Sequence, residues 1–166
     1  MTKWTSALIT SFMLALNATA APLPQPEGPV ILSITGNIQN TQDGKTARLD
    51  LAQLEALKSN TFTLQTRWSD STHSYHGPLL SAILNYVGAK GDHFRLTALN
   101  EYSIEFERHY METYEPILAL SEDEKPLSIR EKGPLWLILP HHKFPELNAE
   151  QHTGRMIWQL SQIEIE

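Results

Sequence analysis

The sequence predicts a single α+β domain in which strands outnumber helices. Short apolar segments, either β-branched or alternating with polar residues, are separated by turn residues, and this pattern is typical of strands. Two further segments space their apolar residues as helices do. The 166 residues are enough for one domain with its own hydrophobic core, and no internal repeat divides them.

An uninterrupted apolar run, L-W-L-I-L at residues 135–139, is predicted to be the central strand. Gly133 and Pro134 precede the run and Pro140 follows it, so both of its ends are marked by turn residues. A strand without polar alternation is covered on both faces, which places this one in the middle of the fold. Residues 130–132 (R-E-K) would then lie at the rim of the core.

The first half of the chain begins with a β-branched strand at residues 30–35 and a turn-rich connection. Asp50 is positioned to cap a short helix that ends before Asn60. Residues 61–68 alternate apolar and polar side chains, which predicts a half-buried strand, and a polar loop follows at residues 69–75. The first helix has an apolar side made of Leu51, Leu54 and Leu57.

A second helix is predicted to begin at Gly77-Pro78, because proline is favoured in a first helical turn. Its stripe of leucine, isoleucine and valine runs to Gly88, which ends the helix. The rest of the chain is predicted as strands at 94–99 and 102–106, a loop or one helical turn at 108–114, an apolar segment at 116–120, an acidic turn at 121–125, a long polar loop at 141–153 and a last strand at 155–166.

The N-terminal residues 1–20 have the pattern of a secretory signal peptide. Lys3 supplies a positive charge, residues 5–16 are mostly apolar, and Ala18-Thr19-Ala20 is a small-residue cleavage signal. The apolar segment is short for a membrane anchor, although an uncleaved anchor is the alternative. We therefore expect cleavage after Ala20 and a periplasmic protein without direct membrane insertion.

The expected organisation after cleavage is a proline-rich leader at residues 21–29 and one domain at residues 30–166. The chain contains no cysteine, which excludes disulfides, thiolate nucleophiles, cysteine-bound zinc and cysteine-bound iron–sulfur clusters. A net charge of -6 disfavours nucleic acid and anionic membrane surfaces as partners.

Motifs that carry catalysis by themselves are missing from the sequence. It contains neither a G-x-G-x-x-G nor a G-K-[ST] phosphate loop and no G-x-S-x-G nucleophile elbow. A Ser/His/Asp triad assembled from distant segments stays open. For the remaining clusters we favour solvated side chains over metal or acid–base sites: the pairs His73 with His76 and His141 with His142, and the glutamates 101, 105 and 107.

Four segments combine a strand end with aromatic, amide or charged side chains. If their strands share a sheet, these ends would converge into a site for a flat, polar heterocycle. Aromatic rings would stack on its faces, an amide or carboxylate would pair with its edge, and a guanidinium would meet its carbonyl. Unrelated charges at strand ends fit the spacing equally well. The four segments are Arg67-Trp68, Asn100-Glu101-Tyr102, Arg130 with Lys132, and Arg155 with Trp158.

Four motifs in order resemble the sulfite-oxidase-type molybdopterin-binding domain. They are Y-H-G-P-L-L-S-A-I-L at 75–84, L-T-A-L-N-E-Y-S at 96–103, K-G-P-L-W-L-I-L-P at 132–140 and R-M-I-W-Q-L-S-Q-I at 155–163. Their order and separations are similar to that family's W-x-G-x-x-L, D-G-Y, G-x-P-L-R-L-x-x-P and K-W segments. The resemblance covers the chain from about residue 30 onward and implies a β-rich molybdopterin-binding fold.

The chain departs from that family at three positions. The enzymes bind molybdenum through a cysteine near the end of the strand that corresponds to residues 61–68, and a threonine such as Thr66 cannot replace that soft, easily deprotonated ligand. Trp136 stands where the family has arginine, and Glu101 where it has glycine. The chain therefore more closely resembles a small periplasmic subgroup of pterin-binding regulators.

The resemblance to this subgroup implies a sensor that binds a free pterin and docks onto the periplasmic domain of a membrane-bound cyclic-di-GMP cyclase/phosphodiesterase. The alternatives are a molybdopterin-dependent oxidoreductase with an unusual ligand set, and a non-catalytic interaction module with a relic pocket. In the sensor, Trp68 and Tyr102 are expected to stack on the ring, and Asn100 and Glu101 are expected to bind its amino edge. Arg67 and Arg130 are expected to bind its oxygens. Arg155 and Trp136 are further candidates for ligand contacts, and the alternative place for Trp136 is the core.

Overall fold

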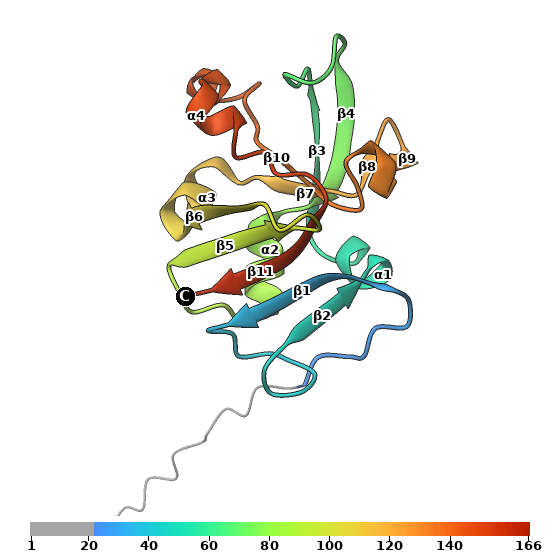
Figure 1. Cartoon of the computed structure of the whole chain (residues 1–166), viewed down its shortest axis with the longest axis vertical. Helices are drawn as coiled ribbons and strands as arrows, with labels where there is room; N and C mark the ends of the chain where they lie inside the picture. Colours follow the sequence, from blue (N-terminus) through green and yellow to red (C-terminus); the bar gives the residue numbers. More distant parts are fainter. Residues whose placement is uncertain (1–21) are drawn as a thin grey trace, which may run out of the picture.

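The computed structural model describes residues 22–166 (Figure 1). The predicted signal peptide, residues 1–20, lies outside the described residues. Within 22–166 the chain forms a five-stranded sheet, a four-stranded sheet and a two-stranded ladder, with short helices between them. The predicted α+β class, with strands in the majority, is confirmed. None of the helices in this part of the chain is long and apolar enough to cross a membrane.

The five-stranded sheet is the base of the molecule and has the strand order β2-β1-β11-β5-β6. β1 pairs in parallel with β11, and the other neighbours pair antiparallel. Ile34 lies opposite Ile163, which in turn lies opposite Leu96, and all three are buried. The strands are β1 (Val30–Gly36), β2 (Ala47–Asp50), β5 (His93–Ala98), β6 (Ser103–Glu107) and β11 (Leu160–Ile165).

Helix α1 (Leu51–Glu55) begins at Asp50, as the sequence predicts. The Asp50 carboxylate accepts a hydrogen bond from the backbone N–H of Gln53, and the Gln53 side chain accepts one from the backbone N–H of Asp50. Only Leu54 of the predicted apolar side is fully buried. Leu51 is 43% exposed, because α1 is little more than one turn long and can turn only one of its leucines toward the core.

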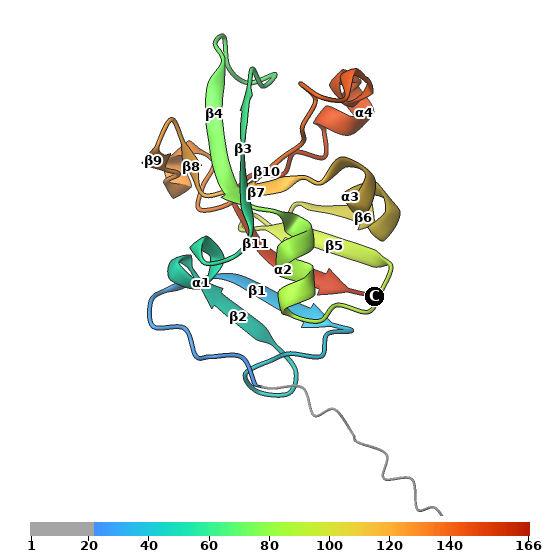
Figure 2. The same ribbon diagram turned by 180° about the vertical axis from the view of Figure 1, so that it is seen from behind.

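Helix α2 (Leu80–Tyr86) lies across one face of the five-stranded sheet (Figure 2). Its predicted apolar stripe is confirmed, since Leu80, Ile83 and Leu84 are buried. Pro78 belongs to the preceding strand rather than to the helix, and Leu79 is the residue at the helix N-cap. Gly88 follows the helix with a φ of 63°, a left-handed conformation that glycine adopts without strain.

A long hairpin of β3 (Ser59–Leu64) and β4 (His73–Pro78) projects away from this base, with β8 (Ser121–Glu122) and β9 (Lys125–Pro126) beside it (Figure 1). The predicted polar loop at residues 69–75 is wrong in its second half, because β4 finds backbone partners in both β3 and β8. The predicted alternation along residues 61–68 is confirmed: Phe62, Leu64 and Thr66 are buried, and Thr63 is exposed.

The apolar run 135–139 is completely buried, but it is not the central strand of the main sheet. Three residues of this run, Trp136–Ile138, form β10, which pairs with β7 (Ile117–Ala119) in a two-stranded ladder between the two sheets and makes a single bridge to Trp158. Proline on either side limits the length of the strand. β11 occupies the central position of the five-stranded sheet instead.

Three further predictions are corrected in the second half of the chain, and one element is found where none was predicted. Residues 108–114 form a full helix, α3 (Arg108–Tyr114). The predicted loop 141–153 contains the 3-10 helix η2 (Pro145–Asn148) and α4 (Glu150–Thr153), and it buries Leu147. Residues 129–131 form the 3-10 helix η1 (Ile129–Glu131). The last strand begins only at Leu160, because the chain before it bends and Gln159 has a φ of 54°.

The proline-rich leader packs on the domain from its first described residues. Leu23 is buried, and its N–H donates to the Thr41 carbonyl. The backbone N–H groups of Glu27 and Gly28 both donate to the Asp50 carboxylate, at 2.8 Å each. Asp50 therefore holds the leader and caps α1 at the same time.

Candidate functional site

An aromatic cavity of about 340 Å³ opens beside the end of β5, between the turn after that strand and the bend before β11. Such a volume is within the range of small-molecule sites. No charged side chain lines this aromatic cavity. Its lining consists of Trp68, Ala98, Asn100, Tyr102, Gly154, Met156, Ile157 and Trp158.

Three tryptophans form a cluster at the wall of the aromatic cavity. The Trp68 ring centre lies 5.1 Å from that of Trp158 and 5.8 Å from that of Trp136, in edge-to-face arrangements. Trp136 is completely buried and donates its indole N–H to the Met156 carbonyl at 3.1 Å. Trp68 and Trp158 therefore face the cavity, while Trp136 supports Trp68 from the core and does not line the cavity.

The turn between β5 and β6 supplies further lining residues. Asn100 accepts a hydrogen bond from the Tyr102 N–H through its Oδ1, at 3.1 Å, which leaves the amide NH₂ group as its free donor. Tyr102 is 54% exposed and lines the cavity. Glu101 has a φ of 67° and is exposed outside the cavity, so the expected contact of Glu101 with a ligand there is not supported.

The predicted arginines do not converge on the aromatic cavity. The Arg67 guanidinium carbon lies 5.5 Å from the Trp68 ring centre, and its Nη1 donates to Thr153 Oγ1 at 3.2 Å, which draws it into a neighbouring cavity. Arg155 stacks on Tyr110 and Phe106, at 4.9 and 5.4 Å from their ring centres. The bend that shortens β11 therefore directs Arg155 toward α3.

Arg130 lies exposed in η1 and does not line the aromatic cavity. The structure thus brings together three of the eight predicted residues, Trp68, Asn100 and Tyr102, at one cavity. Trp158, which belongs to one of the four converging segments but not to the eight predicted residues, also lines the cavity. The sequence did contain a signal for it, since Trp158 follows Arg155 in the last of the four family-like motifs.

A polar cavity of about 270 Å³ adjoins the aromatic one, and Met156 lines both. The pair Arg67 and Trp68 separates them, with Arg67 on the polar side and Trp68 on the aromatic side. The polar cavity is lined by Gln65, Thr66, Arg67, His141, Asn148, Thr153 and Met156.

The donors near these cavities do not fit the molybdenum of the family enzymes. The chain has no cysteine, and the hydroxyl of Thr66, two residues beyond β3, is not a soft thiolate donor. Among residues 22–166, no group of three or more histidines and carboxylates is arranged to hold a metal ion. The aromatic cavity does suit the planar ring of a pterin, so the ring fits the residues present and the metal does not.

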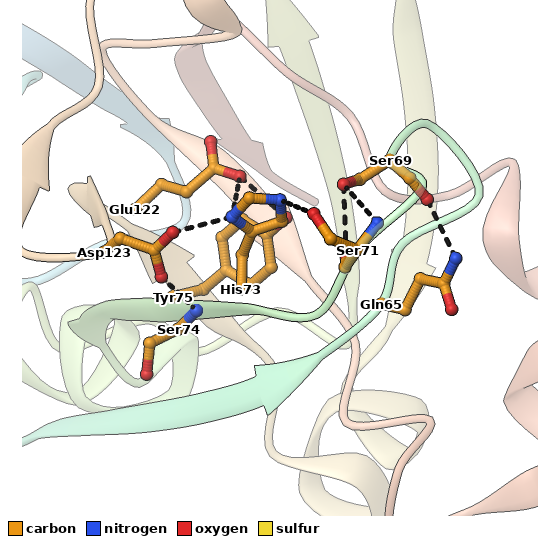
Figure 3. A network of polar contacts seen from close by, with 8 residues as sticks. All are labelled: Gln65, Ser69, Ser71, His73, Ser74, Tyr75, Glu122 and Asp123. Atoms are coloured by element: carbon orange, nitrogen blue, oxygen red, sulfur yellow. Dashed lines mark hydrogen bonds and ion pairs between the residues drawn. The ribbon is translucent and has the colours of Figure 1, made fainter.

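A separate polar cluster joins β4 to the β8–β9 hairpin (Figure 3). Ser71 Oγ lies 2.8 Å from His73 Nε2, and His73 Nδ1 lies 2.7 Å from Asp123 Oδ2. Burial raises the pKa of Tyr75, whose hydroxyl donates to Glu122. Hydrogen bonds from the Ser74 N–H and from His73 hold the pKa of Asp123 below its usual range.

The hydrogen bonds link Ser71, His73 and Asp123 in the order of a hydrolase triad. Their surroundings, however, are those of a structural contact between β4 and the β8–β9 hairpin. Ser71 and Asp123 are exposed, and Ser71 does not line the adjacent hollow. We therefore assign the cluster to the attachment of the hairpin. His73 and His76 lie on a strand rather than in the predicted loop, so residues three apart point to opposite faces and cannot bind one metal together.

The chain has a sulfite-oxidase-like fold. The crystal structure of the sulfane dehydrogenase SoxCD from Paracoccus pantotrophus superposes with a TM-score of 0.57 and 16% sequence identity. The match covers 81% of this chain and 37% of that chain, so the present sequence spans little more than a third of its neighbour. No protein-family model and no curated protein matches the chain. At this identity the likeness shows the fold alone.

Proposed function

We propose that this chain is a periplasmic pterin-binding signalling protein, with the pterin ring held in the aromatic cavity. The observation that carries the proposal is a cavity with tryptophan and tyrosine walls, one free amide donor and no charged lining residue. Such a lining suits a flat, neutral heterocycle with a polar edge. Trp68, Trp158 and Tyr102 provide ring faces, and the Asn100 NH₂ group donates to a ring carbonyl or nitrogen.

The signalling half of the proposal rests on the family resemblance and on the missing thiolate. A pterin without molybdenum supplies no redox-active metal. The signal that the partner enzyme detects would therefore be the binding of the pterin itself. In this proposal the pterin-bound protein docks onto the periplasmic domain of a membrane-bound cyclic-di-GMP cyclase/phosphodiesterase and changes the ratio of the cyclase and phosphodiesterase activities.

Tryptophan fluorescence reports directly on this site. Trp4 belongs to the predicted signal peptide, so the mature chain keeps three of the four tryptophans, and all three lie in the cluster at the cavity. Titration of the mature chain with oxidised and reduced pterins is expected to quench this fluorescence with saturation. Absence of saturable binding for every pterin would refute the proposal.

Three variants locate the binding site. Tyr102→Ala is expected to weaken pterin binding about tenfold, because stacking of a base on an aromatic ring contributes roughly 1–3 kcal/mol. Tyr86→Ala, which removes a partly buried tyrosine from α2 outside the cavity, should leave the affinity unchanged. Asn100→Asp keeps the acceptor for the Tyr102 N–H but removes the donor, so it tests the polar contact without disturbing the turn.

The fold also favours a second candidate, a molybdopterin-dependent oxidoreductase. Metal analysis of protein purified from its native compartment separates the two, since stoichiometric molybdenum together with turnover of an oxyanion or sulfoxide would favour the enzyme. Release of a metal-free pterin on denaturation would favour the sensor. The third possibility, an interaction module with a relic pocket, predicts binding to the cyclic-di-GMP enzyme that is unaffected by pterin.

A further inference from the structure

The polar cavity contains two buried polar atoms without a partner. Within residues 22–166, Thr66 Oγ1 and His141 Nδ1 are the only buried side-chain nitrogen or oxygen atoms that lack a hydrogen bond. Both residues line this one cavity, and Thr66 is only 2% exposed. Since buried polar groups are nearly always paired, two unpaired atoms in one cavity indicate a place where a bound ligand or water molecule supplies the partners.

The chemistry of the partner follows from the tautomer of His141. Its Nε2 lies 2.9 Å from the backbone carbonyl of Gln65, and a carbonyl only accepts, so Nε2 carries the hydrogen. In the neutral ring Nδ1 then has a lone pair and needs a donor. The Thr66 hydroxyl can donate or accept, and Arg67, which donates one N–H to Thr153, has further donors.

A hydroxyl group satisfies this set of atoms better than an anion does. It donates to His141 Nδ1 while its oxygen accepts from Thr66 or Arg67, and a second hydroxyl repeats the pattern. A carboxylate or a fully ionised phosphate offers acceptors only, so it would face the Nδ1 lone pair without a proton between them. No carboxylate of the protein lines the cavity, so nothing there selects a cationic group.

We propose that the polar cavity is a subsite for a neutral, hydroxylated chain, with Thr66 and His141 as its recognition residues. The shared Met156 wall and the Arg67-Trp68 pair place this subsite next to the ring site. The inference rests on the proposed function where the hydroxyls belong to the side chain of the bound pterin. A free polyol has the same chemistry and is the other source.

Three probes and two variants test the subsite. The probes are a pterin with a vicinal-diol side chain, 6-methylpterin and glycerol. Thr66→Val removes the unpaired hydroxyl and keeps the shape, while the control Thr63→Val removes an exposed hydroxyl that bonds Ser74 on the other face of β3. Affinities are measured by fluorescence titration, and the His141 ring is followed by nitrogen NMR.

The expected result is that the diol pterin binds more tightly than 6-methylpterin and shifts the His141 Nδ1 resonance. Thr66→Val should weaken the diol pterin about fivefold, in the range of one neutral hydrogen bond. It should leave 6-methylpterin unchanged, and Thr63→Val should change neither. The unliganded Thr66→Val protein should unfold at close to the parent's urea concentration, because the Tyr75 hydroxyl beside Thr66 keeps its own hydrogen bond to Glu122.

The outcomes separate this inference from the proposed function. Equal binding of both pterins, unaffected by Thr66→Val, would overturn the subsite and leave the ring site standing. If no pterin binds but glycerol shifts His141 and Thr66→Val abolishes that shift, the subsite holds as a polyol site and the proposed function fails. If no probe binds, both are refuted.

Discussion

Trp136 is the residue for which burial and ligand binding give opposite expectations. As a candidate ligand contact it would be dispensable for folding, whereas the structure places it in the core behind Trp68. The variant Trp136→Phe keeps an aromatic ring at this position and removes the indole N–H. It therefore asks how much the buried indole contributes to the free energy of unfolding.

The expected loss is about 3 kcal/mol. Phenylalanine leaves the Met156 carbonyl without the indole donor that lies 3.1 Å away, which costs roughly 1–3 kcal/mol for a buried polar group. The smaller ring also leaves a cavity against Tyr75 and Trp68, which costs about 1 kcal/mol more. For a chain of this size the sum corresponds to a decrease in Tm of about 9 °C.

Urea unfolding of the mature chain, followed by circular dichroism, measures this loss directly. The matched comparison is Trp158→Phe, which changes a partly exposed tryptophan that lines the aromatic cavity. Trp158→Phe should cost less than about 1 kcal/mol and should weaken pterin binding. A Trp136→Phe protein with parental stability but without pterin binding would refute the reasoning, because Trp136 would then be a ligand contact.

Two further predictions concern the scaffold. Backbone N–H donors from Gly28 and Gln53 hold the pKa of Asp50 below its ordinary value of 3.8, so the stability it contributes is present above that value and is lost as the pH falls below it. Between pH 7 and pH 3, the free energy of unfolding measured in urea should therefore decrease less for Asp50→Asn than for the parent. The same decrease in both proteins would contradict this. Gly77→Ala should yield no soluble protein, because its Cβ would overlap the Leu118 carbonyl where β4 crosses β7, whereas Gly28→Ala meets only ordinary contacts and should fold. Soluble expression of Gly77→Ala at the level of Gly28→Ala would show that the crossing can relax.

The spacing of apolar residues within one segment was enough to predict which side of a strand or helix is buried. The alternation in β3 and the apolar stripe of α2 were read correctly, because each reports which side of its own element faces the core. β4 was missed, since its residues H-S-Y-H-G-P carry little strand signal. That strand exists because distant segments, β3 and β8, pair with its backbone. Pairing partners of this kind cannot be read from one segment.

The candidate site shows the same difference between what a single segment predicts and what contacts between distant segments determine. Trp68 and Tyr102 were predicted at the cavity because each follows a strand whose end the sequence marks. Arg130 and Arg155 were placed there as well, but a 3-10 turn and a bend before β11 direct them elsewhere. The polar cavity was not predicted, because Thr66 and His141 meet only through tertiary structure.

The position of β11 has a consequence for how the chain acquires its fold. The five-stranded sheet has its C-terminal strand in the middle, between β1 near the other end of the domain and β5. Until residues 160–165 are in place, β1 and β5 have no common partner, and the main sheet is two separate hairpins with open edges. Contacts so distant in sequence make folding slow. A chain truncated before residue 160 would therefore be a substrate for proteases and aggregation rather than a smaller version of this domain.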